Sequence, residues 1–373
     1  MKIAVIGPAY PYRGGIAHYT TMLASKLINA GHETSIISFR RQYPAWLYPG
    51  KTDKDPSKPV IELETKFTLD PVYPWTWIGT VNEIKRIHPD LILIAWWTTF
   101  WAPGFWVLAR LLSRDLYKVV FLIHNVIPHE DKPWDRWIAQ KVLQQGSAYI
   151  VQSDNEKKRL RSLLPDSEPV ICPHPVYNQF IGLSSPAEDT AEQLQALKKN
   201  LPTLLFFGIV RPYKGLQYLI EAVSILKDSG VLVQLIIAGE FWEKKQHYKE
   251  LIMQLELDDQ VLLFDQYIPD DQVSLFFNQA NIFVAPYVAG TQSGSAKIAL
   301  SFDLPIVATE CIADSVLKSS ERVTVIPPAD SVALASVIEN IIEGGFPERN
   351  PILQDDSSWN LLVSTIEDLG SKT

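Results

Sequence analysis

The sequence predicts an α/β protein built from two doubly wound domains. Short apolar runs that suit buried strands alternate with amphipathic segments of helical period along nearly all of its 373 residues. The alternation occurs twice, before and after a polar stretch, and a chain of this length is long for a single core. We expect a first domain over residues 1–175, a linker over 176–200 and a second domain over 201–355.

The first domain opens with a strand, a helix and a second strand, at residues 2–7, 16–27 and 33–39. This order predicts a parallel sheet. Gly14 and Gly15 stand at the start of the helix, where the lack of side chains lets a ligand approach the backbone. The alternative is that they only permit a turn. The sequence lacks the GxGxxG pattern, which disfavours a nicotinamide-type dinucleotide site.

Residues 42–76 show no sustained period and are rich in Pro, Tyr, Trp and Lys, so we predict a long surface loop. Loops of this length are usually functional or mobile. Asp53-Lys54-Asp55 has the DxD spacing that can hold a metal ion, but no strand adjoins it. We therefore expect no metal site there.

Two further strands of the first domain end in side chains that can contact a ligand. Residues 90–96 lead into Trp97, and residues 118–123 lead into His124. Ligands gather at the carboxyl ends of parallel strands, so Trp96 and Trp97 are placed where a substrate would lie, with core packing as the alternative. His124 can transfer protons or orient a sugar hydroxyl, and the alternative is a hydrogen-bonded structural histidine.

The second domain is organised around residues 203–223. A strand from Thr203 to Gly208 leads through Arg211 and Lys214 into a helix that begins near Gly215. Backbone N–H groups and two cations at a helix start suit a phosphate. The alternative is that both cations are ordinary solvated loop residues.

A second helix start follows the strand at 282–286 and is rich in small and hydroxylated residues. Ser293 suits an N-cap whatever else it does. Two such helix starts in one domain are what a diphosphate needs, and two domains facing each other across a cleft would seat a nucleotide-bearing ligand. The residues of this helix start are Thr291, Gln292, Ser293, Gly294 and Ser295.

The net charge of −8 conceals two different halves. Residues 1–180 hold 21 Lys and Arg against 16 Asp and Glu, whereas the remainder holds 13 against 26, so the net charges are +5 and −13. Nine of the eleven tryptophans precede residue 140. The acidic balance argues against a nucleic-acid partner. The basic, Trp-rich half suits a sugar or a membrane surface, although its tryptophans equally suit a core.

Several features favour a reducing cytoplasm. Met1 is followed by Lys2 and a short strand-like run, not by the apolar core of a signal peptide. No apolar run approaches the ~18 residues of a transmembrane helix. Cys172 and Cys311 lie far apart without a CxxC or Cys/His cluster, so neither a disulfide framework nor a zinc site is expected.

The chain resembles the glycosyltransferases of the GT-B fold, and among them family 4 (group 1), whose members are retaining enzymes that use nucleotide sugars. The order and spacing of several motifs carry the resemblance along nearly the whole chain. The motifs are Gly14-Gly15, HNVIPHE (124–130), FFGIVRPYKGLQYLIEAV (206–223), IAGE (237–240), FDQYIPDDQVSLFF (264–277) and PYVAGTQSGSAKIALSFDLPIVAT (286–309).

The resemblance implies a role for each matching position. Lys214 contacts the donor diphosphate with Arg211 as its partner cation, Gly14 and Gly15 approach the donor phosphate, and His124 lies near the transferred sugar. Tyr267 and Ile268 hold the nucleobase. The other implied donor contacts are Gly208, Gly239, Glu240, Thr291, Gln292, Ser293 and Gly294, and the expected acceptor contacts are Tyr19, Trp96 and Trp97.

The sequence departs from the family pattern at three positions. Ile209 follows Gly208 where the family usually has an arginine. The family also carries two glutamates separated by seven residues, and Gly290 and Ile298 occupy those positions. The GTQSG segment resembles a recurring variant in which Thr291 to Gly294 face the donor instead.

The resemblance implies transfer of a hexose to a hydroxyl acceptor with retention, with an N-terminal acceptor domain, a C-terminal donor domain and no metal or other cofactor. Residues 356–373 are expected to form a helix that packs back toward the N-terminal domain. We favour a cell-envelope glycan or glycolipid acceptor and a cytoplasmic enzyme with peripheral contact to the inner membrane face. The alternatives are a sugar-nucleotide epimerase and a non-catalytic sugar-nucleotide-binding protein.

Overall fold

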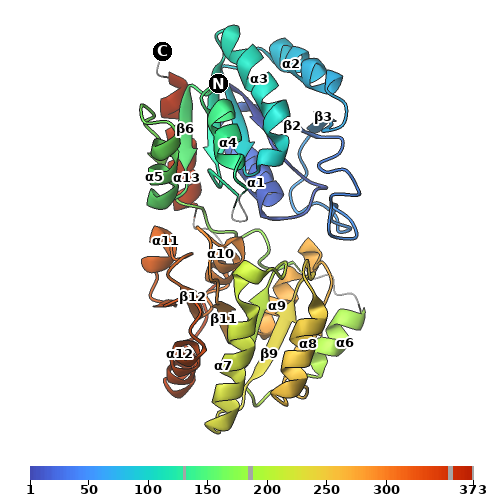
Figure 1. Cartoon of the computed structure of the whole chain (residues 1–373), viewed down its shortest axis with the longest axis vertical. Coiled ribbons are helices and arrows are strands. Elements are labelled where there is room, and N and C mark those ends of the chain that lie inside the picture. Colours follow the sequence, from blue (N-terminus) through green and yellow to red (C-terminus); the bar gives the residue numbers. More distant parts are fainter. Residues whose placement is uncertain (129–131, 184–187, 352–355, 372–373) are drawn as a thin grey trace. The chain divides into compact units, whose positions relative to one another are not determined.

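The chain folds into two compact units, and each unit contains one parallel β-sheet (Figure 1). The first unit comprises residues 1–174 with 356–373, and the second comprises residues 175–355. The prediction of two doubly wound α/β halves is confirmed, because both sheets are parallel and helices connect their strands. The structure is a computed structural model, which describes residues 1–128, 132–183, 188–351 and 356–371.

The first unit is built on a seven-stranded sheet in the order β3-β2-β1-β4-β5-β6-β7, with every neighbouring pair parallel. The strand order grows outward from β1 and β4 in opposite directions, so the loops after these two strands flank the position where α/β proteins bind ligands. The strands are β1 (Lys2–Ile6), β2 (Glu33–Phe39), β3 (Thr65–Leu69), β4 (Leu91–Trp96), β5 (Lys118–Ile123), β6 (Ala148–Val151) and β7 (Val170–Ile171).

Strand β3 corrects the prediction that residues 42–76 form one long loop. Among the described strands, β3 pairs with β2 alone and lies at the edge of the sheet, and Leu69 is its buried residue. An edge strand of this kind needs no apolar run, so the sequence carries little signal for it. Helix α2 (Trp75–Ile87) also begins inside the segment.

Six helices and one 3₁₀ turn complete the described part of the first unit. Helix α3 packs against both α2 and α4, whereas α13 packs against α1. Trp359 of α13 is fully buried with its ring 5.2 Å from that of Tyr19, and Lys26 forms an ion pair with Asp356 at 2.5 Å. Besides α2, these elements are α1 (Gly15–Asn29), η1 (Thr99–Trp101), α3 (Ala102–Arg114), α4 (Asp135–Leu143), α5 (Asp154–Leu163) and α13 (Ser357–Ser371).

The second unit is built on a six-stranded parallel sheet in the order β10-β9-β8-β11-β12-β13. Its strands are β8 (Thr203–Phe207), β9 (Gln234–Ala238), β10 (Val261–Phe264), β11 (Ile282–Ala285), β12 (Ile306–Thr309) and β13 (Val323–Ile326). Its helical elements are α6 (Glu188–Gln195), η2 (Pro212–Lys214), α7 (Leu216–Asp228), α8 (Lys245–Gln254), η3 (Asp270–Gln272), α9 (Val273–Gln279), α10 (Gly294–Ser301), α11 (Ser315–Lys318) and α12 (Ser331–Glu343).

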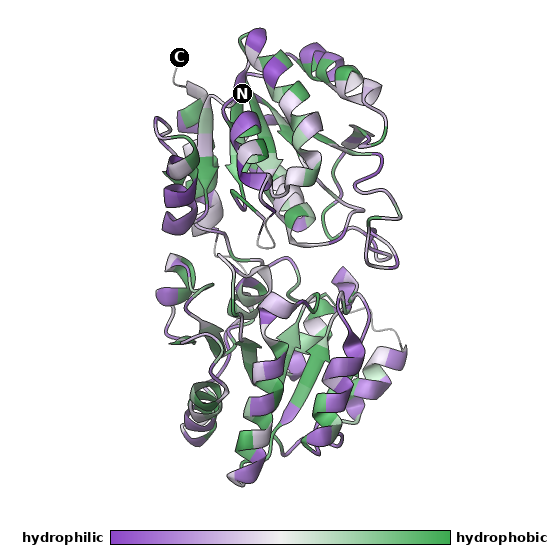
Figure 2. Ribbon diagram, viewed as in Figure 1, coloured by the Kyte–Doolittle hydropathy of each residue, from purple (hydrophilic) through white to green (hydrophobic). Residues whose placement is uncertain are grey.

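Each unit has its own hydrophobic core between sheet and helices. The central strands are apolar on both faces, as in the LILIAW run of β4, because helices cover both sides of a doubly wound sheet. Figure 2 shows these strands in green and the outer faces of several helices in purple. Among the described helices, none is long and apolar enough to cross a bilayer.

Candidate functional site

In the second unit, the loop between β8 and α7 places Lys214 at the start of a helix. Gly215 allows this geometry, because its φ of 66° is left-handed and an added Cβ would lie 2.1 Å from the Pro286 carbonyl oxygen. Gly208 directly follows β8 and has a φ of 104°, and a Cβ there would lie 3.1 Å from Lys214 Nζ. The two glycines therefore leave room for the ammonium group and for the backbone that holds it.

Arg211 lies in the same loop, with its guanidinium 4.8 Å from the centre of the Trp242 ring. The Trp242 indole donates a hydrogen bond of 3.0 Å to Glu240 Oε2. Gly239 has a φ of 152°, and a Cβ on it would lie 2.1 Å from the Gly208 carbonyl oxygen, so Gly239 lets the ends of β8 and β9 approach closely. Trp242 has no signal in the sequence, because its contact with Arg211 depends on neighbouring strands.

Tyr287, which follows β11, connects this loop to the start of α10. Lys214 Nζ lies 5.4 Å from the centre of the Tyr287 ring. On the other side, Ser293 Oγ donates a 3.3 Å hydrogen bond to the Tyr287 hydroxyl. The two helix starts predicted from sequence are therefore joined through one buried aromatic residue, which the sequence analysis did not single out.

Lys214 and Tyr287 shift each other's pKa. Burial acts to raise the pKa of the Tyr287 hydroxyl, but the Lys214 ammonium and the hydroxyls of Ser293 and Ser295 outweigh it, so the pKa lies below its ordinary value. Burial acts to lower the pKa of Lys214, and the neighbouring Tyr287 and Tyr213 more than offset it, so this pKa is raised. Lys214 is therefore cationic at neutral pH.

The start of α10 has the predicted N-cap. Ser293 Oγ accepts a hydrogen bond from the Ala296 N–H at 3.2 Å, and the Ser293 and Ser295 hydroxyls lie 3.0 Å apart. Thr291 is buried, and Oε1 of the half-buried Gln292 has no hydrogen-bond partner among the described residues. Gly294 is the first helical residue, and a Cβ on it would touch the Tyr177 ring.

A buried ion pair between Lys297 and Asp314 joins α10 to the start of α11. Lys297 Nζ lies 2.6 Å from Asp314 Oδ1, and these side chains are 0% and 2% exposed. Asp314 Oδ1 also accepts the Leu317 N–H at 3.0 Å and caps α11. This pair has no signal in the sequence, because nothing local distinguishes a buried lysine from a surface lysine on a short helix.

The loop after β10 carries the two residues expected to hold a nucleobase. Tyr267 is half-buried and its hydroxyl donates to Asp270 Oδ1 at 3.3 Å, while Ile268 is buried. The loops after β8, β9, β10 and β11 all lie at the carboxyl edge of one parallel sheet. The expected donor residues of this unit therefore share one edge.

In the first unit, His124 follows β5 and is buried. Its Nδ1 lies 3.1 Å from the Gln152 side-chain amide nitrogen, and its ring stands perpendicular to that of Tyr19 at 4.7 Å. Burial, with a smaller contribution from nearby His174, lowers the pKa of His124 to about 3. Because Gln152 donates to Nδ1, the proton of the neutral ring sits on Nε2, which has no partner among the described residues. A hydrogen-bond donor role suits this imidazole better than proton transfer. His129 and Glu130 of the same sequence motif lie outside the described residues.

The three expected acceptor residues have different surroundings. Tyr19 is fully buried between His124, His174 and Trp359. Trp96 is the last residue of β4 and lies in the core, with its indole donating to the Val126 carbonyl. Neither ring is exposed to an acceptor, because both side chains are 0% exposed. Trp97 is half-buried and donates to the Tyr43 hydroxyl at 3.1 Å.

Gly14 and Gly15 leave the backbone open at the start of α1. Gly14 is the N-cap with a φ of 103°, and a Cβ added to either glycine would meet no described atom within 4 Å. This arrangement suits a ligand that contacts the backbone. The nearby Asp55 carboxylate instead accepts the Ser57 N–H at 2.7 Å. Among the described residues, no group of three or more His, Cys, Asp or Glu could hold a metal.

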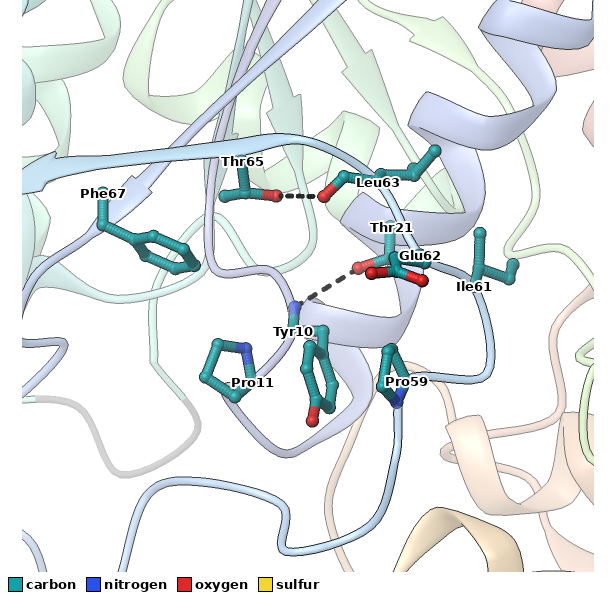
Figure 3. Close-up of a pocket in the computed structure, with 9 residues that line it drawn as sticks. All are labelled: Tyr10, Pro11, Thr21, Pro59, Ile61, Glu62, Leu63, Thr65 and Phe67. Carbon is teal, nitrogen blue, oxygen red and sulfur yellow. Dashed lines mark hydrogen bonds between the residues drawn. The ribbon is translucent and has the colours of Figure 1, made fainter.

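A cavity of about 200 Å³ lies in the first unit beside the loop that leads to Gly14 (Figure 3). The Tyr10 hydroxyl donates to the Ser57 carbonyl at 2.8 Å, which ties the loop to the segment before β3. Most of the residues that line the cavity are apolar, and Glu62 is the charged residue among them. The lining residues are Tyr10, Pro11, Thr21, Pro59, Ile61, Glu62, Leu63, Thr65 and Phe67.

Comparison with known proteins assigns a family to both units. Residues 13–177 match the model of glycosyltransferase family 4, and residues 201–344 match that of the glycosyl transferases group 1. A GDP-mannose:glycolipid 4-beta-D-mannosyltransferase of Xanthomonas campestris is 24% identical over 193 residues, which is 51% of this chain. The match spans about half of that relative's length, 49%.

Solved structures share the fold at low sequence identity. HepE of Anabaena, in complex with UDP and glucose, has a TM-score of 0.66 at 16% identity over 100% of this chain and 95% of its own. The catalytic domain of starch synthase IV of Arabidopsis thaliana, bound to ADP and acarbose, has a TM-score of 0.69 at 14% identity over 99% of this chain and 98% of its own. The chain therefore belongs to the family 4, group 1 glycosyltransferases and has their GT-B fold.

Proposed function

We propose that this protein transfers a hexose from a nucleotide diphosphate sugar to a hydroxyl acceptor with retention of configuration. The proposal rests on one observation. Lys214, Tyr287 and Ser293 link two helix starts at one edge of the sheet. A diphosphate has two charged groups to neutralise, and this edge offers an ammonium group, a guanidinium group and the N–H groups of α10.

The chemistry assigned to these groups is stabilisation of the leaving diphosphate. The bond between the anomeric carbon and the phosphate oxygen breaks, the diphosphate keeps the electron pair, and the acceptor oxygen forms the new bond. The acceptor proton passes to the departing phosphate oxygen. Lys214 and Arg211 neutralise the growing charge, a contribution worth ~3–4 kcal/mol per donor group in water-excluded sites.

In this proposal the first unit receives the acceptor and the sugar end of the donor. His124 is only 1% exposed, so its Nε2 can donate to a sugar hydroxyl only if binding of the donor uncovers it, and its low pKa keeps the ring neutral. The open backbone at Gly14 and Gly15 is accessible to a ligand. Trp97 remains an acceptor candidate, whereas the burial of Tyr19 and Trp96 leaves them to support the site from within.

We further propose a lipid-linked or cell-envelope glycan as acceptor, with the enzyme in the cytoplasm and in contact with the inner membrane face. The Xanthomonas relative is named for a glycolipid acceptor. The first 180 residues carry a net charge of +5, the sign that anionic lipid attracts. The HepE structure contains UDP, and the name of the Xanthomonas relative contains GDP-mannose. UDP- and GDP-sugars are therefore the first donors to test.

The test is incubation of the protein with UDP-, GDP-, ADP- and dTDP-sugars and a bacterial lipid extract. Released nucleoside diphosphate and glycosylated lipid are followed by mass spectrometry, and the anomeric configuration is read by NMR. We expect transfer from at least one donor, with a large loss of turnover in Lys214→Ala and Arg211→Ala but not in the exposed Lys249→Ala. An isomerised sugar nucleotide without transfer would favour an epimerase instead.

Metal independence is part of the proposal and has its own test. The expected result is full activity in EDTA, because the cationic side chains at the β8–α7 loop take the place of a metal at the diphosphate. Activity that EDTA abolishes and manganese or magnesium restores would contradict this.

A further inference from the structure

We propose that helices α2, α3 and α4 present a tryptophan rim, made of Trp75, Trp106, Trp134 and Trp137, that seats the first unit on an anionic lipid bilayer. The inference rests on the proposed function for its purpose, since a lipid-linked acceptor must be reached at a membrane. It goes further by assigning the surface that makes the contact.

The sheet topology brings the rim residues to one edge. Strands β3, β4 and β5 run parallel, and α2, α3 and α4 follow them in turn, so all three helices begin at the carboxyl edge of the sheet. Helix α3 packs against both α2 and α4, and the three lie side by side (Figure 1). The loop with Gly14 follows β1 and lies at this edge too.

Each helix exposes tryptophan near its start. Trp75 is the first residue of α2 and is 68% exposed, Trp106 is the fifth residue of α3 and is 40% exposed, and Trp137 is the third residue of α4 and is 61% exposed. Trp134 is the N-cap of α4 and is also exposed. Four large exposed indoles near one edge exceed the scattered apolar residues of an ordinary surface.

The indole N–H groups distinguish the rim tryptophans from three tryptophans that donate to backbone carbonyl groups. Trp77, Trp96 and Trp101 donate to the carbonyl oxygens of Asp70, Val126 and Gln42. The four rim indoles make no such hydrogen bond to any residue that the structure describes. At a bilayer interface, the apolar ring of a tryptophan packs at the acyl boundary and its N–H group donates to the headgroups, so an indole N–H without a protein partner suits this position.

Cations beside the rim favour an anionic bilayer. Of the six Lys and Arg residues on α2, α3 and α4, four lie in the last turns, away from the rim: Lys85, Arg86, Arg114 and Lys141. Arg136 is the second residue of α4 and lies within one turn of Trp134 and Trp137. Cations also lie against the rim itself, with Arg110 5.9 Å from the centre of the Trp106 ring and Lys132 5.6 Å from that of Trp134. Indoles beside cations match an interface of acyl chains and phosphate headgroups.

The test is cosedimentation with vesicles of phosphatidylcholine containing roughly 30% phosphatidylglycerol at ~0.15 M salt. We expect the wild-type protein to bind these vesicles and to bind pure phosphatidylcholine vesicles less. The triple variant Trp75→Ser/Trp106→Ser/Trp137→Ser should lose about tenfold in partition coefficient. The matched control Leu116→Ser/Leu232→Ser/Val332→Ser removes exposed apolar side chains elsewhere and should bind as the wild type does.

A wild-type protein that stays in the supernatant, or a rim variant that binds as well as the wild type, would overturn the proposal. Equal binding to neutral vesicles would overturn the part assigned to the cations. Circular dichroism checks that each variant folds. The vesicle readout does not depend on catalysis, so a protein that binds vesicles but no nucleotide sugar contradicts the proposed function alone, and the reverse result contradicts only the rim.

Discussion

Replacing Lys297 by methionine is expected to lower the free energy of unfolding of the second unit by about 3–5 kcal/mol. Lys297 and Asp314 are 0% and 2% exposed, and 2.6 Å separates Nζ from Oδ1. Without the lysine, a carboxylate is left in the interior with no opposite charge, and its Oδ2 already has no hydrogen-bond partner among the described residues. The loss should exceed that of an ordinary surface pair severalfold.

The double variant Lys297→Met/Asp314→Asn gives the sharper comparison. Asparagine can still cap α11 and carries no charge, so we expect it to recover at least about 2 kcal/mol of the single-variant loss. Arg161→Met is the matched control, because Arg161 pairs with Glu168 at 2.6 Å on the surface and should cost at most about 1 kcal/mol. Urea unfolding by circular dichroism measures the losses, and hydrogen exchange in α10 and α11 assigns them to this unit. A Lys297→Met loss no larger than that of Arg161→Met, or a double variant no more stable than the single, would refute the reasoning.

Three further variants test other parts of the site. Tyr287→Phe removes the hydroxyl that bonds Ser293, so nucleotide affinity measured by calorimetry should fall about fivefold, or about 1 kcal/mol, and unchanged affinity would argue against the link. Gly215→Ala should cost at least about 2 kcal/mol in urea unfolding, because alanine is strained at a left-handed φ and would clash with Pro286; a neutral result would show that the loop relaxes. His124 has a folded pKa of about 3 against an ordinary 6.5, so the unfolded state binds the extra proton as pH falls, and His124 alone should lower stability by about 2 kcal/mol between about pH 7.5 and about pH 5, in addition to a similar loss from His18, whose pKa burial lowers to about 4. His124→Gln removes this contribution, and an equally steep pH dependence in the variant would place its origin elsewhere.

The fold was largely predictable, because its signals are local. Buried parallel strands appear as apolar runs such as LILIAW, and the helices between them show a period near 3.6. Strand β3 was not predicted, because an edge strand buries little of its side-chain surface and TKFTL contains no apolar run. The helix starts at Lys214 and Ser293 were also predictable from glycines, cations and small hydroxylated residues.

The contacts that organise the site were not predictable, because they join residues far apart in the sequence. Tyr287 links Lys214 to Ser293 only after β8 and β11 become neighbours in the sheet. Trp242 reaches Arg211 because β9 lies beside β8. Trp96 and Trp97 are adjacent in sequence, yet one is buried in the core and the other is half-buried at the strand end, a distinction that composition does not contain.

The central claim is that the second unit holds the diphosphate of a nucleotide sugar through Lys214 and the start of α10. The most direct measurement is a thermal-shift titration of the wild type, Lys214→Ala and Lys249→Ala with UDP-, GDP-, ADP- and dTDP-sugars in EDTA. We predict that at least one donor stabilises the wild type and Lys249→Ala, by about 2.7 kcal/mol at ~100 times its Kd, and that Lys214→Ala loses most of this shift. No shift with any donor, or an equal shift in Lys214→Ala, would contradict the claim.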